Sequence, residues 1–294
     1  MKKFAPWIAL FGLLIQPLLA LDTASIDQIT GLKGTFNEEE KVFKISVPRG
    51  DIGITVDGWK APAFMGLTTW AAFVDGKEKD AMVMGDLVLL QDEVNPVMSV
   101  LLDSGLSVTA LHNHFFYDEP RVFFMHISGE GSVEELSKGV RAALDKVKDV
   151  RSGSAQPAKS FGSAMPEKSA ITTAPLTEVL GGKPQEKDGM VKFVFGRKAK
   201  MPCGCEVGKE MGVNTWAAFA GSDDNAVVDG DFACLESELT GVLKSLRSGG
   251  INIVAIHQHM TLENPRYVFL HYWGRGKAAQ LAGTIKAARE TQSE

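Results

Sequence analysis

All six histidines of this 294-residue chain fall into two copies of one spacing. Each copy reads His-x-His, then eleven residues, then a third histidine, and the second copy lies 145 positions after the first. Imidazole is the commonest protein ligand for metals and titrates near neutral pH. The pattern predicts a site for a divalent transition metal in each half, or one composite site between the halves, with Zn, Cu, Ni and Fe as candidates. The predicted ligands are His112, His114, His126, His257, His259 and His271.

Strand geometry can bring the three histidines of each copy together. Side chains on a strand alternate between its faces, so His112 and His114 point the same way. A hairpin centred near position 119 would place His126 directly opposite His112 and on the same face. The same register applies to the second copy, whereas a slip of one residue would turn the third histidine away.

A carboxylate follows each His-x-His pair. Glu119 lies five residues past His114, and Glu263 lies four residues past His259. A carboxylate beside a metal-bound water can act as a general base, so these two are the candidate catalytic residues if the protein is an enzyme. The spacing is similar to the metal motif of cupins, but the glycine that follows the cupin glutamate and the second cupin motif are absent.

Two further acidic residues and two tryptophans also occupy matching positions. Asp86 and Asp231 each follow a glycine, which is consistent either with a role beside a metal or with capping a turn. Trp70 and Trp216 each precede Ala-Ala-Phe in a run that reads as buried, so both are predicted to be core residues.

A non-catalytic binding or structural module is the alternative interpretation. Histidines on an apolar strand face can be core residues that bond to backbone or carboxylate groups, and a duplication preserves packing as well as function. Under either interpretation the expected partner is an unidentified small molecule or metal. The oligomeric state is left open.

The duplication extends beyond the histidines. The two repeats are predicted to span residues 22–150 and 176–294. The segment 151–175 between them is rich in Ser, Ala, Gly, Pro and Lys, which is typical of a linker. The matching stretches include Gly66–Phe73 with Gly212–Phe219, and Val108–His114 with Ile253–His259.

The first repeat alternates strand and helix patterns. Runs with period-two hydrophobicity predict strands, and Glu93–Asp103 has the apolar spacing of a helix. Ser132 with Glu135 three residues later forms a capping box that begins the last helix. The prediction is an α+β fold, an internally duplicated two-layer unit with an antiparallel sheet and two helices per repeat. The predicted strands are Lys41–Val47, Thr69–Val74, Ala81–Leu90, Ser107–Phe116 and Arg121–Ser128.

Residues 1–20 have the pattern of a secretory signal peptide. Lys2 and Lys3 precede an uncharged, mostly apolar stretch that ends at Ala20, a small residue suited to cleavage. This pattern predicts a periplasmic or secreted protein. No cysteine follows the predicted cleavage site, so no lipid anchor is expected.

The charge balance argues against a nucleic-acid partner. The chain has a net charge of −5, which becomes about −7 when the leader and its two lysines are removed. A protein that binds phosphate backbones needs a basic surface. Cys203, Cys205 and Cys234 are an odd number of thiols, and their disulfide pairing is left open.

Four stretches of the sequence carry a resemblance to a known family. They are Val108-Thr-Ala-Leu-His-Asn-His114, Gly85-Asp-Leu-Val-Leu89, Asn214-Thr-Trp-Ala-Ala-Phe219 and Phe269-Leu-His-Tyr-Trp-Gly274. Together they resemble the LppY/LpqO family, a bacterial family of exported proteins and lipoproteins whose domain has no assigned function. The resemblance covers both repeats. It implies export but no activity, and the chain differs from the lipoprotein members because it lacks a lipidation cysteine.

Overall fold

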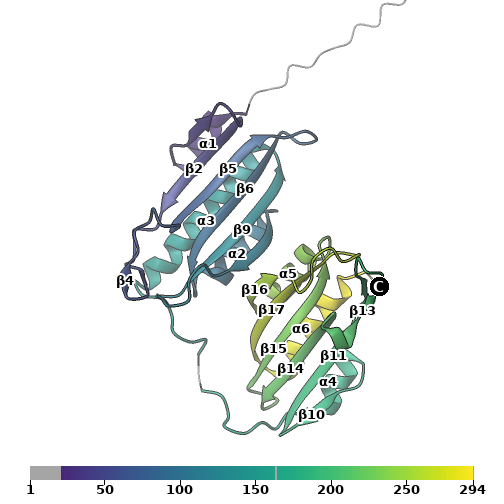
Figure 1. The fold of residues 1–294 in the computed structure, drawn as a ribbon. Coiled ribbons are helices and arrows are strands. Elements are labelled where there is room, and N and C mark those ends of the chain that lie inside the picture. Colours follow the sequence, from purple (N-terminus) through teal and green to yellow (C-terminus); the bar gives the residue numbers. More distant parts are fainter. Residues whose placement is uncertain (1–20, 163, 294) are drawn as a thin grey trace, which may run out of the picture.

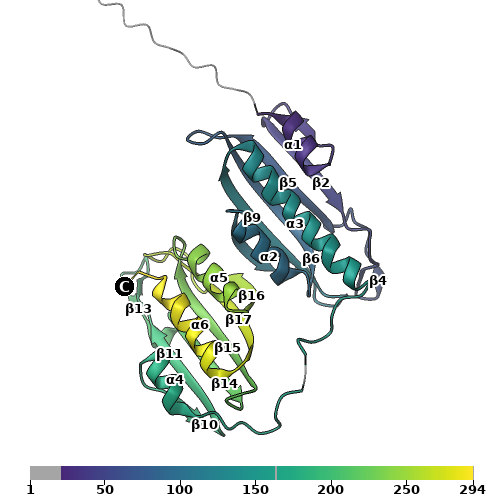
Figure 2. The same ribbon diagram turned by 180° about the vertical axis from the view of Figure 1, so that it is seen from behind.

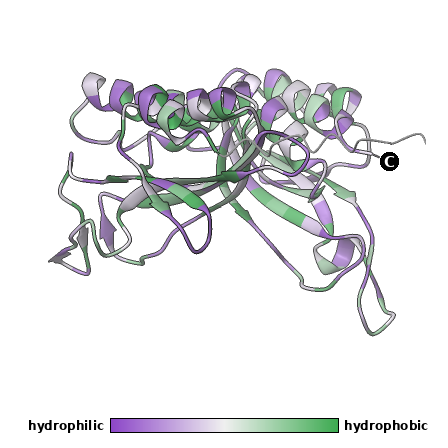
Figure 3. Cartoon of the chain, turned by 90° about the horizontal axis from the view of Figure 1, so that it is seen from above, coloured by the Kyte–Doolittle hydropathy of each residue, from purple (hydrophilic) through white to green (hydrophobic). Residues whose placement is uncertain are grey.

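The structure is a computed structural model that describes residues 21–162 and 164–293. The predicted leader, residues 1–20, lies outside the described residues. The described chain forms one large antiparallel sheet of 12 strands. Its α-helices lie on one face of this sheet (Figure 1, Figure 2 and Figure 3). The other face, called the open face below, is covered only in part, by segments around residues 52–61 and 199–207.

The first repeat begins with a short helix and then alternates strands with two longer helices (Figure 1). Its described elements are α1 (Thr23–Thr30), β1 (Thr35–Asn37), β2 (Val42–Pro48), β3 (Thr55–Val56), β4 (Trp59–Lys60), β5 (Thr68–Asp75), β6 (Ala81–Leu90), α2 (Val94–Asp103), β7 (Ser107–His112), β8 (Asp118–Glu119), β9 (Val122–Gly131) and α3 (Val133–Gly153).

The second repeat follows the same order. Its described elements are α4 (Thr173–Leu180), β10 (Gln185–Lys187), β11 (Met190–Gly196), β12 (Ala199–Lys200), β13 (Glu206–Val207), the 3-10 turn η1 (Lys209–Met211), β14 (Asn214–Gly221), β15 (Ala226–Leu235), α5 (Leu239–Ser248), β16 (Asn252–His257), β17 (Tyr267–Gly276) and α6 (Ala278–Glu290).

The strand order of the large sheet is symmetric about its centre. The order β1-β2-β5-β6-β9-β7 of the first repeat continues into β16-β17-β15-β14-β11-β10 of the second. The antiparallel pairing of β7 with β16, with Leu111 opposite Ile256, joins the two halves. The repeats therefore share one sheet, and one hydrophobic core extends through both of them.

A buried asparagine strengthens this junction. The Asn95 side chain on α2 donates a hydrogen bond to the carbonyl of Ile253 at 3.1 Å, and the Ile253 N–H donates to Asn95 Oδ1 at 2.7 Å. Ile253 borders a β-bulge on β16, so the asparagine satisfies backbone groups next to an irregularity of the ladder. On the facing helices, Arg247 Nε donates to Ser99 Oγ at 3.1 Å.

Alternation along β9 shows how the two faces of the sheet differ. Met125 and Ile127 belong to the core beneath the helices, whereas Phe124 belongs to a separate cluster on the open face. His126 shares the face of Phe124 and lies opposite Ala110 of β7. The predicted pairing of His126 with His112 is therefore wrong by two residues. A shift of two residues keeps a side chain on the same face of a strand, so His126 still shares the face of His112, as predicted. The β-bulge between Val108 and Ala110 gives the two strands this register.

Local signals in the sequence account for the main elements. The Ser132 side chain accepts a hydrogen bond from the Glu135 N–H while the Glu135 side chain accepts one from the Ser132 N–H, so the predicted capping box is confirmed. The duplicated α+β fold is also confirmed, and the structure adds the short helices α1 and α4. An open sheet covered on one face is not a cupin barrel, so the cupin alternative is wrong.

The cysteines and the helices bear on two further expectations. All three cysteines are free: Cys234 is buried in the core, whereas Cys203 and Cys205 are exposed in the turn between β12 and β13. Within the described residues, no helix combines the length and the apolar composition needed to cross a bilayer.

Each repeat uses a buried ion pair to tie a strand to a helix. Arg49 follows β2 and contacts Glu93, the N-cap of α2, at 2.6 Å. Arg197 follows β11 and contacts Glu238, the N-cap of α5, at 2.6 Å. Burial by itself would raise the pKa of Glu238, but hydrogen bonds from Arg197 and Ser293 outweigh it and lower the pKa to about 2.

Replacement of this carboxylate should destabilise the fold in a pH-dependent way. Glu238→Gln leaves Arg197 without its counter-charge, so the free energy of unfolding at pH 7 should fall by about 3 kcal/mol. The folded pKa lies below the unfolded one, so the contribution is complete above about pH 4.5 and is lost as the pH falls toward 2. Urea unfolding between pH 7 and pH 3 checks this, with Glu236→Gln at an exposed site as the control. A loss equal to that of the control would contradict it.

Candidate metal centre

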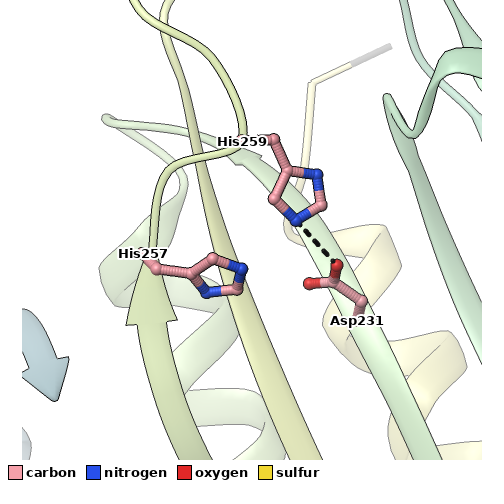
Figure 4. A group of neighbouring side chains, drawn as sticks. All are labelled: Asp231, His257 and His259. Atoms are coloured by element: carbon pink, nitrogen blue, oxygen red, sulfur yellow. Dashed lines mark ion pairs between the residues drawn. The ribbon is translucent and has the colours of Figure 1, made fainter. Parts of the chain in front are cut away.

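Three side chains able to bind a metal converge on the open face of the second repeat (Figure 4). Asp231 lies on β15, His257 is the last residue of β16, and His259 lies in the loop that follows. β17 separates β15 from β16 in the sheet, and the loop folds His259 back toward Asp231. The ligand atoms of the three residues all lie within 4.8 Å of one another.

The shortest contact in this group joins two atoms that both carry lone pairs. Asp231 Oδ2 lies 3.4 Å from His259 Nε2. His259 Nδ1 lies 3.2 Å from the carbonyl oxygen of Gly212. A carbonyl can only accept, so the ring proton of the neutral imidazole sits on Nδ1 and Nε2 carries a lone pair. The two facing atoms therefore repel unless a proton or a cation lies between them.

The spacing of these two atoms suits a metal. Two ligands bound at about 2.1 Å to a tetrahedral ion are about 3.4 Å apart. The separation of Asp231 Oδ2 from His259 Nε2 is the same, 3.4 Å. No two ligand atoms of the group are more than 4.8 Å apart, so binding at one tetrahedral ion would bring the widest pair closer by up to about 1.4 Å.

Neighbouring groups hold the rings in place. His271 lies directly opposite Asp231 in the sheet, and its Nδ1 is 3.3 Å from the carbonyl oxygen of Gly230. Its ring stacks on that of His257, with 4.8 Å between the centroids, and the His259 ring stacks on Phe269 at 3.6 Å. Ring orientation and tautomer are thus set by contacts outside the ligand group, as is usual at metal sites.

Burial shifts the pKa values of two of the candidate ligands in opposite directions. Burial raises the pKa of Asp231 to about 7, although the charge of His271 acts in the opposite direction. Burial and the neighbouring histidines lower the pKa of His257 to about 4, so this imidazole is neutral at pH 7. Asp231 Oδ1 and His257 Nδ1 are buried without a hydrogen-bond partner. Such atoms are costly to leave unpaired, and a bound cation with its water ligands would supply partners.

The first repeat contains the matching residues in a looser arrangement. His112 Nε2 lies 3.2 Å from His114 Nε2, and the ring of His126 stacks on that of His112 with 5.2 Å between centroids. Asp86, the counterpart of Asp231, lies opposite His126 and has a buried Oδ1 without a partner. All three predicted histidines of each repeat therefore lie together. Within the described chain, however, a compact three-ligand group is found in the second repeat alone.

With the duplication and both histidine groups established, the chain can be compared with known proteins. A family model described as Domain of Unknown Function (DUF1259) matches residues 24–146 and 174–291. The chain belongs to the DUF1259 family. Its two matched stretches are the two copies of one DUF1259 domain.

Other comparisons with this DUF1259 protein add little. No curated protein matches the chain. Among solved structures, the crystal structure of a trimeric bacterial microcompartment shell protein, PduB, aligns with 88% of this chain and 89% of its own length. The identity is 12% and the TM-score is 0.23, which is too low to support any inference about fold or function.

The two glutamates predicted as general bases lie outside the ligand group of the DUF1259 domain. Glu119 is exposed on β8. Glu263 is buried and accepts a hydrogen bond from the Tyr267 N–H at 3.0 Å, so it fixes the turn before β17. The carboxylates that lie beside the histidines are instead Asp86 and Asp231. Their place opposite a histidine could not be read from the sequence, because it depends on pairing between distant strands.

The tryptophans of the two DUF1259 domains lie on the open face, so their prediction as core residues is wrong. Trp70 pairs with Asp86, and Trp216 pairs with Asp231, across adjacent strands. Phe73 is fully buried on the other face of β5. Side chains alternate between the two faces of a strand, so Trp70 and Phe73, three residues apart, lie on opposite faces. This difference could have been predicted from the sequence.

Two cavities adjoin the second-repeat site. One, of about 370 Å³, is lined by Asp231, His259 and Trp216 among other residues. The other, of about 600 Å³, is lined by His271 and Trp273 and is bordered by Phe161 of the segment between the repeats. The ligand group can therefore be reached from solvent.

The ring tautomers give a direct test of this geometry. In metal-free protein at pH 8, His259 and His271 should carry their proton on Nδ1, because each Nδ1 faces a backbone carbonyl. Two-dimensional ¹⁵N–¹H correlation spectra of the imidazoles distinguish the two tautomers. Spectra of His259→Ala and His271→Ala assign the signals. A protonated Nε2 on His259 would contradict the proposed pair of facing lone-pair atoms.

Proposed function

We propose that this DUF1259 protein is an exported metal-binding protein. The second repeat binds a divalent transition metal through Asp231, His257 and His259. The observation that carries the proposal is the contact of Asp231 Oδ2 with His259 Nε2 at 3.4 Å, where a cation would replace repulsion by two coordinate bonds. One carboxylate and two imidazoles suit Zn, Cu, Ni or Fe and leave coordination positions open.

The first repeat is proposed to hold a second and weaker site. His112 Nε2 and His114 Nε2 are 3.2 Å apart, a separation that two ligands of one ion can have. Asp86 Oδ1 is available as a third ligand because it has no hydrogen-bond partner. The site is expected to be weaker because these atoms must move further to meet at one ion.

Metal binding is favoured over a purely structural role for the histidines. None of the six histidines is fully buried: four are half-buried, and His114 and His259 are exposed. Core histidines would be enclosed and have both ring nitrogens satisfied. The proposal stops at binding, since Glu119 and Glu263 lie outside the group and no base is assigned to a reaction.

The proposal also includes export and the position of the domains. Residues 1–20 act as a cleaved signal peptide, and the mature protein is periplasmic or secreted. It is an LppY/LpqO-type protein without a lipid anchor. The repeats 22–150 and 176–294 flank a linker at 151–175, a division supported by the matched stretches 24–146 and 174–291, although α3 continues to Gly153 and α4 begins at Thr173.

Metal titration tests the site. The untagged protein should be studied as Cys203→Ser/Cys205→Ser, because exposed thiols bind the same metals. Calorimetric titration with Zn or Ni at pH 7.5 should show one tight site per chain. His257→Ala and Asp231→Asn should each weaken it at least about a hundredfold, since each removes a direct ligand.

The control for this titration is Asp229→Asn. Asp229 lies on the same strand two residues away, outside the ligand group, so its replacement should change the affinity less than about threefold. No uptake of Zn, Cu, Ni or Fe by the folded parent protein would refute the proposal. An equal loss in Asp229→Asn and Asp231→Asn would show that net charge, and not coordination, is responsible.

Cell fractionation tests export. When the full chain is expressed in a bacterium, the mature protein should be recovered in the periplasm or medium and should begin at Leu21, the residue after Ala20. N-terminal sequencing and fractionation check this. Lys2→Glu/Lys3→Glu reverses the charge of the n-region and should slow processing. Full-length protein retained in the cytoplasm would contradict the proposed export.

A further inference from the structure

The polar cavity next to Asp231 and His259 is also lined by charged and aromatic side chains that are not ligands of the proposed metal. It holds about 370 Å³ on the open face. Besides the two metal ligands, its walls include a tryptophan, two lysines and a glutamate from β11, β14 and η1: Lys192, Lys209, Glu210 and Trp216. A metal bound by Asp231 and His259 would therefore lie at one wall of a space large enough for a small molecule.

One cation of this cavity is held by an aromatic ring and not by an ion pair, although its charge also acts on the carboxylate of Asp229. Lys209 contacts Glu210 at 3.3 Å. Lys192, in contrast, makes no ion pair within the part of the chain that the structure describes, and its Nζ lies 4.2 Å from the centre of the Trp216 ring. The ring holds the ammonium group by cation–π attraction and leaves N–H donors free. Trp216 in turn lies directly opposite Asp231 in the sheet.

The same platform occurs in the first repeat. Lys44 Nζ lies 4.4 Å from the centre of the Trp70 ring, and Trp70 lies opposite Asp86. Each repeat thus places a lysine, a tryptophan and the metal-ligand aspartate on three successive strands of the open face. The arrangement is part of the duplicated unit, which distinguishes it from a chance surface lysine.

Charge decides what this cavity can bind. Without a metal, the charges of Lys192 and Lys209 balance those of Glu210 and Asp231 at a pH above 7, where Asp231 is ionised, and Asp229 lies one step further along β15. A cavity with no net charge would bind an anion only weakly. A divalent ion would give the cavity a net positive charge, with the metal at one wall and the free ammonium of Lys192 at the other.

We propose that the second repeat binds a small organic anion whose carboxylate or phosphate oxygens coordinate the metal and accept a hydrogen bond from Lys192. This inference rests on the proposed metal site. It predicts that anion binding requires the metal, and that anion and metal strengthen each other's binding by the same factor.

The experiment uses the full mature chain with Cys203→Ser/Cys205→Ser, loaded with Co(II). Acetate and inorganic phosphate are titrated separately, and visible absorption of Co(II) reports a change in coordination. The Co-loaded protein should bind at least one of them, and the metal-free protein should bind neither by calorimetry. Lys192→Met should weaken the anion about tenfold, the loss expected for one charge-assisted hydrogen bond, with Co(II) affinity unchanged.

Lys187→Met is the matched control, because it removes the same charge from the neighbouring strand β10 outside the cavity. It should leave anion affinity unchanged. Acetate and phosphate distinguish a carboxylate from a phosphate ligand. Co(II) binding without a response to either anion would overturn the proposed anion site. Equal losses of anion affinity in Lys192→Met and Lys187→Met would overturn it as well. Neither result would contradict the metal site. Failure to bind Co(II) or any other metal would overturn the metal site and this inference together.

Discussion

The proposed metal site is built around one contact that is unfavourable unless a proton or a cation lies between the two atoms. A buried aspartate oxygen and an imidazole nitrogen face each other at 3.4 Å, and the backbone carbonyl of Gly212 keeps the ring proton on the far side of His259. The two facing lone pairs repel each other, and a positive charge between them would be stabilised. Burial raises the pKa of Asp231 to about 7, so a proton would compete with a metal for this carboxylate near neutral pH. A metal would bind Asp231, His257 and His259 at once, whereas a proton bridges only one pair of atoms.

The sheet positions Asp231, one partner of that contact, and the neighbouring ligand His257. Asp231 and His257 come from strands on either side of β17, and the pairing of β7 with β16 at the centre joins both repeats into one sheet. A site built on strands keeps its geometry better than one built on loops. Only His259 comes from a loop, and its stacking on Phe269 restrains it.

Duplication placed two versions of the site on one face, and the versions differ. Where the first repeat has Met84 opposite Ser128, the second has Asp229 opposite Trp273. The second repeat also has the compact ligand group and the adjoining cavities. Within the described chain, the second repeat is therefore the one that brings three candidate ligands into a compact group.

The sequence predicted those features of the structure that depend on local signals or on the alternation of side chains between the two faces of a strand. The strand Ala81–Leu90 has the bounds expected from its composition, and the capping box at Ser132 begins α3 as expected. The face shared by the histidines followed from the period of two. What could not be predicted is contact between distant strands: the pairing of Asp231 with His271, and the joining of the repeats through β7 and β16. Proximity in sequence favoured Glu263, whereas proximity in space favours Asp231.

Anomalous X-ray scattering can show whether Asp231, His257 and His259 bind one metal ion. Crystals of the mature protein grown with Zn or Ni should give an anomalous difference peak at the metal's absorption edge. The peak should lie about 2.0–2.2 Å from an oxygen of Asp231 and from one nitrogen each of His257 and His259. A metal-loaded crystal with its peak elsewhere, and with Asp231 and His259 still in contact through a shared proton, would contradict the account.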